Sequence, residues 1–202
     1  MSEDRVESLA KNPSTANDRK MFNALAMLLL VVFVINTLDN YRIGQLQDML
    51  WICHVSMLLL AVGMYARRQQ FIQIAALWIF PGFVFWFVDA WFSGYTWASA
   101  ASHFVAIISA YYAMRRVGAV LGLWRYAMLF WLLLQLLARW LTPASANVNI
   151  AFTVRAEATW AFEAYWQYWM FTCVAALFGL WCLEKILHRG FSRLLEADEA
   201  MS

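Results

Sequence analysis

Long apolar stretches separated by short charged segments dominate the pattern of this chain. Six of them have the length of a spanning helix and end at charged residues, at about 21–38, 49–66, 71–92, 97–114, 118–140 and 164–187. A bilayer core needs roughly 20 mostly apolar residues per helix, with a tolerance of a few residues, so each stretch is long enough to cross. We therefore predict an all-α, polytopic membrane protein, a bundle of six transmembrane helices.

The positions of lysine and arginine predict the orientation of this bundle. Basic residues cluster before the first stretch, between the second and third, between the fourth and fifth, and after the sixth: Arg19, Lys20, Arg67, Arg68, Arg115, Arg116, Lys185, Arg189 and Arg193. Because basic residues concentrate in cytoplasmic loops, both termini are predicted to be cytoplasmic. The chain then divides into a cytoplasmic segment (1–20), a transmembrane domain (21–187) and a cytoplasmic tail (188–202).

Composition supports a membrane location and excludes some classes of function. Hydrophobic residues make up 63% of the chain and charged residues 14%, more apolar surface than a soluble domain of 202 residues can cover. The net charge is +2, and no basic cluster alternates with aromatic residues, so we expect no nucleic-acid partner. Membrane lipids are the expected partners, together with a second copy of the chain or another membrane protein. The short loops with paired arginines are typical of a bacterial inner membrane.

Ionisable side chains inside the predicted spans are the first candidates for function, because each is costly at hydrocarbon depth. They are His54, Asp89, His103, Arg125, Arg139 and Glu163. His54 and His103 each lie six residues from the outer end of their span, roughly 9 Å below the boundary. Asp89 and Arg139 lie at a similar depth. We expect these four to meet in one cavity open to the outer side, while Arg125 extends toward the cytoplasmic boundary.

The connection 142–152 is the longest loop on the outer side and carries two asparagines, Asn147 and Asn149. Their amides either bind a ligand carbonyl or fix a histidine tautomer, as parts of a lid, or cap helices and solvate the boundary. With Arg139 and Ser99, they are the candidate ligand-binding residues.

One interpretation of the cavity is catalytic. Cys53 or Ser56 serves as nucleophile, His103 as general base, and Asp89 orients the imidazole, with His54 beside them. Cys53 and His54 are separated by about 100° around the helix, and His54 and Ser56 by about 160°, so the last two cannot both point straight into one pocket. At headgroup depth such a site meets lipid esters, and the chemistry is acyl transfer to water or to another lipid.

The stretches WICHVSMLL at 51–59, ASHFVAIISAYYA at 101–113 and NVNIAF at 147–152 resemble the androgen-induced-gene family of membrane lipid hydrolases and the related six-helix acyltransferase-like proteins. The resemblance covers about residues 45–152. It implies a threonine or cysteine nucleophile paired with a histidine on a nearby helix. His103 matches the family histidine and Cys53 the nucleophile, whereas His54 has no counterpart.

Two other interpretations remain open. His54 and His103 are level with each other, as axial ligands of a b-type haem must be, and with Asp89 they also form a set of metal donors. Alternatively, the histidines are hydrogen-bonded structural groups and the protein is a scaffold subunit without chemistry of its own. Cys53, Cys173 and Cys182 have no spacing that predicts a disulfide or a cysteine-based metal site.

Overall fold

The structure is a computed structural model that describes the backbone of residues 16–200 and the side chains of residues 17–191, Ser93 excepted. Within these residues the chain is all-α and forms six α-helices: α2 (Ala16–Arg42), α3 (Ile52–Ala66), α4 (Gln69–Ser93), α5 (Trp97–Val117), α6 (Trp124–Leu141) and α7 (Tyr165–Ala200). Single-turn 3₁₀ helices fill the connections: η1 (Leu46–Leu50), η2 (Ala144–Ala146), η3 (Val148–Ile150) and η4 (Ala156–Ala158).

Three of the six helices are long and apolar enough to cross a membrane: Asn17–Arg42, Gln69–Phe92 and Tyr165–Phe191. The chain is therefore a candidate multi-pass membrane protein. The helix α3 is also apolar, but its 15 residues extend only about 22 Å, less than the thickness of a hydrocarbon core. Much of the outer surface is apolar, as expected where lipid replaces water; Trp91, Phe92 and Trp140 are more than three-quarters exposed.

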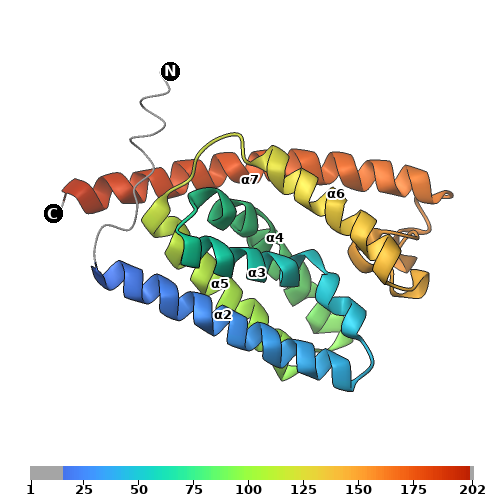
Figure 1. Ribbon diagram of the computed structural model, residues 1–202. Coiled ribbons are helices and arrows are strands. Elements are labelled where there is room, and N and C mark those ends of the chain that lie inside the picture. The colour runs from blue at the N-terminus through green and yellow to red at the C-terminus, as the bar shows by residue number, and fades with distance from the viewer. Residues whose placement is uncertain (1–15, 201–202) are drawn as a thin grey trace.

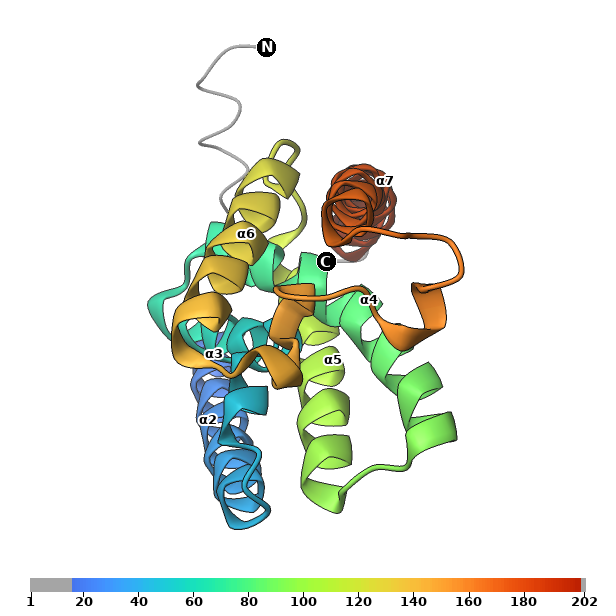
Figure 2. The same ribbon diagram turned by 90° about the vertical axis from the view of Figure 1, so that its right-hand side faces the viewer.

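The helices α2, α3, α4 and α5 pack around a common core, and α6 and α7 lie across one side of it (Figures 1 and 2). Large side chains without any exposed surface fill this core, among them Phe22, Leu29, Leu60 and Met64. The α3–α4 connection is tight because Gly63 allows it: a Cβ there would lie 2.9 Å from the backbone nitrogen of Ile72. This close approach holds α3 and α4 together along their length.

The fifth helix begins later than the apolar pattern predicts. The stretch at 118–140 is helical only from Trp124, because residues 118–123 form a loop in which Gly118 and Gly122 have positive φ angles of 70° and 101°. The other predicted stretches lie within or close to observed helices. The last helix, α7, continues to Ala200, so most of the predicted tail is helical.

Polar side chains hold the 118–124 segment in place, and we call Gln73, Glu184 and His188 the loop clamp. Glu184, 1% exposed, accepts hydrogen bonds from the backbone nitrogens of Gly122 (2.7 Å) and Trp124 (2.9 Å). Gln73 exchanges hydrogen bonds with the backbone of Val120, and His188 Nδ1 donates to the carbonyl of Ala119 at 2.6 Å. The clamp thus ties α4 and α7 to the start of α6.

Candidate functional site

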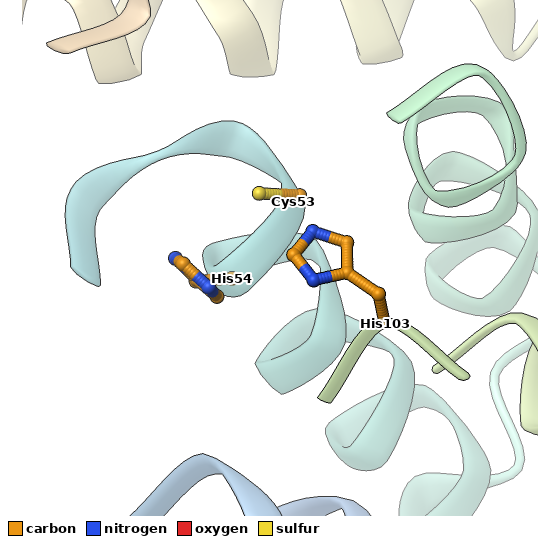
Figure 3. Close-up of side chains that lie close together, drawn as sticks. All are labelled: Cys53, His54 and His103. Atoms are coloured by element: carbon orange, nitrogen blue, oxygen red, sulfur yellow. The ribbon is translucent and has the colours of Figure 1, made fainter. Parts of the chain in front are cut away.

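The two histidines of α3 and α5 meet inside the helix bundle, as their equal depth predicts. The ring centroids of His54 and His103 are 5.6 Å apart, and the residues are 8% and 7% exposed. Cys53 lies beside them on the first turn of α3 (Figure 3). The three line one small cavity of about 10 Å³, enough for about one water molecule, together with Met57, Ile79, Phe83, Ser102 and Ala106. We call this the histidine pocket.

His103 is held rigidly, but one of its nitrogens has no partner. Its Nδ1–H donates to the carbonyl of Ser99 at 2.9 Å, which leaves Nε2 as a buried acceptor without a hydrogen bond among the described residues. Trp86 stacks on the ring at a centroid distance of 4.5 Å and an interplanar angle of 11°. The indole nitrogen of Trp86 in turn donates to the hydroxyl of Ser99 at 3.0 Å. Ser99 therefore orients both rings of this stack.

His54, by contrast, uses both nitrogens. Its Nδ1–H donates to the backbone carbonyl of Asp48 at 2.9 Å, and Nε2 accepts from the side-chain amide of Asn36 at 3.0 Å. Asn36 comes from the C-terminal half of α2 and has no exposed surface.

The side chain of Asp48, whose backbone carbonyl accepts from His54, is itself partly buried. Burial raises the pKa of the Asp48 carboxyl above its ordinary value, although a hydrogen bond from Trp51 opposes this shift.

The helical offset separates the two nucleophile candidates. Cys53 lines the histidine pocket, whereas Ser56 is fully buried, lies outside its lining, and has no hydrogen-bond partner among the described residues. Cys53 lies on the first turn of α3, where a helix dipole favours negative charge, but its place in a small, mostly apolar cavity favours the neutral thiol. The thiol therefore needs a base beside it to react as a nucleophile.

Asp89 and Arg139 do not join the histidines, and here the expectation of a four-residue cavity is wrong. The Asp89 side chain is 60% exposed, and its carboxylate lies 3.7 Å from Arg155. Arg139 donates to the carbonyl of Ala151 and to the hydroxyl of Tyr165. The backbone carbonyl of Ser99 orients His103 in place of Asp89, whose carboxylate lies at the surface beside Arg155.

The two asparagines of the 142–152 loop stabilise structure and do not contact either histidine. Asn149, 1% exposed, accepts from the backbone nitrogen of Ile52 (2.8 Å) and donates to the carbonyl of Leu50 (2.7 Å). It therefore caps the first turn of α3 from a distant part of the sequence. Asn147 accepts from the nitrogens of Phe152 and Thr153 within its own loop. The loop thus positions Cys53 and His54 indirectly.

An aromatic wall of Phe83, Trp86 and Phe104 separates the histidine pocket from a larger groove. Phe83 lines the pocket and contacts Phe104 at a ring distance of 5.2 Å. Trp86 and Phe104 line a groove of about 580 Å³ between the C-terminal end of α4 and the N-terminal end of α5, and its other walls include Trp91 and Trp97. The pocket itself has no slot for a porphyrin between its two rings, which counts against the haem interpretation.

Three residues important to these sites are missed by the sequence analysis. Trp86 lies in an aromatic run that is typical of lipid-facing surface, and Asn36 is a neutral residue within a span, so both have weak signals. Glu184 has a strong one, because it is an ionisable residue inside the sixth apolar stretch, and our list of such residues omits it. The role of each depends on helix rotation, which the apolar pattern does not define.

No protein-family model, no curated protein and no solved structure matches this chain. The geometry of the histidine pocket is therefore the main evidence for its chemistry.

Proposed function

We propose that this chain is an acyl-transfer enzyme of the membrane, with Cys53 as nucleophile and His103 as general base. The observation that carries the proposal is the unpartnered Nε2 of His103, a buried acceptor that shares a small cavity with the thiol of Cys53. A buried polar atom without a partner is rare in folded proteins. A catalytic role explains why Nε2 of His103 lacks a partner, because a general base must be able to accept a proton during the reaction.

The reaction balances with these two groups alone. Nε2 of His103 takes the thiol proton as the sulfur attacks the ester carbonyl of a lipid, and the leaving alcohol then takes that proton. The acyl group stays on Cys53 as a thioester. Water or a second lipid hydroxyl gives its proton to Nε2 of His103 as its oxygen attacks the thioester carbonyl. The C–S bond breaks, the sulfur takes that proton back as a free thiol, and the acyl group leaves as a fatty acid or a new ester.

The surroundings of Cys53 support this role. Cys53 lies on the first turn of α3, where the helix dipole favours the negative charge that develops on the carbonyl oxygen. The stack on Trp86 and the bond to Ser99 hold His103 with Nε2 available as the acceptor. The resemblance of 51–59 and 101–113 to six-helix lipid hydrolases and acyltransferases implies the same nucleophile and the same histidine, Cys53 and His103.

A lipid substrate fits the location of the pocket. With both termini in the cytoplasm of a bacterial inner membrane, the pocket lies beneath the outer headgroups, near lipid ester linkages. The neighbouring groove of about 580 Å³ is apolar and suits an acyl chain. Movement of Phe83 joins the groove to the pocket and admits the ester carbonyl.

The test is acylation of the purified full-length chain in detergent by an activated long-chain acyl ester, followed by intact-mass and peptide mass spectrometry. Wild type should gain one acyl group on Cys53 that neutral hydroxylamine removes. Cys53→Ser should lose this adduct, and His103→Gln should slow its formation about 100-fold or more. The matched control, Cys173→Ser with Cys182→Ser, should acylate like wild type.

Either of two results would overturn the proposal. One is equal acylation of Cys53 in wild type and His103→Gln. The other is an adduct confined to Cys173 or Cys182, which would mean that exposure of a thiol, and not the pocket, decides reactivity.

A further inference from the structure

The histidine pocket gathers three metal-binding donors that acyl chemistry does not need together. The sulfur of Cys53 and one ring nitrogen each of His54 and His103 all lie within 4.8 Å of one another (Figure 3). Acyl transfer uses only the first and the last of these. Closing the three donors around an ion requires movements of about 1 Å, within the reach of side-chain rotation.

Both imidazoles are already held as metal ligands usually are. Each donates its Nδ1–H to a backbone carbonyl, His54 to Asp48 and His103 to Ser99, both at 2.9 Å. That arrangement fixes the tautomer and leaves Nε2 as the donor atom toward a metal. Nε2 of His103 has no hydrogen-bond partner among the described residues. Nε2 of His54 accepts a hydrogen bond from the Asn36 amide, and a bound metal would replace that bond.

The ligand set and its surroundings select the kind of ion. Met57, 1% exposed and one turn after Cys53, places a thioether in the lining of the same cavity. Thiolate and thioether sulfur prefer soft ions such as Cu⁺. One thiolate also neutralises Cu⁺ completely, whereas Zn²⁺ would leave a net positive charge in an apolar cavity, where burying a charge is costly.

We propose that Cys53, His54 and His103 bind one Cu⁺ ion, with Met57 as a weaker fourth ligand. Binding replaces the S–H bond of Cys53 by a sulfur–copper bond and releases the proton to solvent. The bound ion occupies both the nucleophile and the base of the proposed acyl transfer. Copper is therefore an inhibitor of that reaction, and the site extends beyond the proposed function.

The test is a titration of the full-length protein in detergent, under reducing and oxygen-free conditions, with Cu⁺ buffered by a chromophoric chelator. Wild type should take up one Cu⁺ per chain. Cys53→Ser and His54→Gln should each weaken binding at least 100-fold, and Met57→Leu by a smaller factor. The control, Cys173→Ser with Cys182→Ser, should bind like wild type.

X-ray absorption of the copper-loaded wild type should show sulfur and nitrogen neighbours, a readout that does not depend on how the variants fold. Two results would overturn the proposal: wild type that binds Cu⁺ no more tightly than Cys53→Ser, or one equivalent of Zn²⁺ taken up by a chain that rejects Cu⁺. Copper binding without acylation of Cys53 would refute the proposed enzyme alone. Acylation without copper binding would refute this inference alone.

Discussion

Two buried polar clusters of this molecule differ in how completely their groups are hydrogen-bonded. In the loop clamp, both carboxyl oxygens of Glu184 accept backbone hydrogen bonds, and Gln73 and His188 also bond to the 118–124 segment. In the histidine pocket, Nε2 of His103 has no partner among the described residues. Burying a polar group without a hydrogen bond costs free energy, whereas a paired group adds stability. The contrast supports a structural role for the clamp and the chemistry that we propose for the pocket.

The largest expected effect is in the clamp. Glu184→Ala removes two hydrogen bonds to a charged acceptor and leaves two backbone N–H groups without partners, so we expect a loss of about 3 kcal/mol in the free energy of unfolding. Glu184→Gln keeps one acceptor and should lose about half of this. Thermal unfolding in detergent measures both, with the exposed Arg189→Gln as control. A Glu184→Ala variant as stable as the control would end the contrast between the two clusters.

Asn149 connects the outer loop to the pocket, and its replacement comes next in size. Asn149→Ala removes the cap of α3 and places alanine at a φ of +54°, so we expect about 2 kcal/mol of destabilisation and faster alkylation of Cys53 as α3 frays. Asn149→Gly relieves the backbone strain, so its destabilisation measures the loss of the capping hydrogen bonds alone. If Cys53 alkylates at the wild-type rate in both variants, the loop does not position the pocket.

A matched pair of histidine replacements compares the two clusters directly. His188→Phe leaves the carbonyl of Ala119 without its donor and should cost about 1 to 2 kcal/mol. His103→Phe keeps an aromatic ring against Trp86 and removes both the unpartnered nitrogen and the hydrogen bond to Ser99. The Ser99 carbonyl still accepts from the hydroxyl of Ser102 at 2.7 Å, so stability should stay within about 1 kcal/mol of wild type while acylation of Cys53 disappears. Equal destabilisation by the two variants would show that His103 is as structural as His188.

The smallest effect is expected at Asp89. Its carboxylate is exposed beside Arg155, and exposed ion pairs contribute about 0 to 1 kcal/mol. Asp89→Asn should leave both the melting temperature and the rate of Cys53 acylation unchanged. A strong fall in the acylation rate would restore Asp89 to the orienting role that the sequence suggests.

The sequence by itself determines that the chain is helical and apolar, and it predicts that His54 and His103 lie at the same depth. Helical rise is constant, so counting residues from a span's end places a side chain at a depth, and adjacent helices bring equal depths together. Depth alone also suggests that Asp89 and Arg139 join the two histidines. That prediction is wrong, because Asp89 pairs with Arg155 and Arg139 bonds to Ala151 and Tyr165.

Only the tertiary structure decides which groups face the pocket. The rotation of each helix about its axis follows from how its side chains pack against the neighbouring helices. Packing therefore turns Trp86 onto His103, brings Asn36 to His54, and sends Asn149 to cap α3 across nearly a hundred residues of sequence. The difference is physical: depth along a helix is a local property, whereas direction around it depends on every helix packed against it.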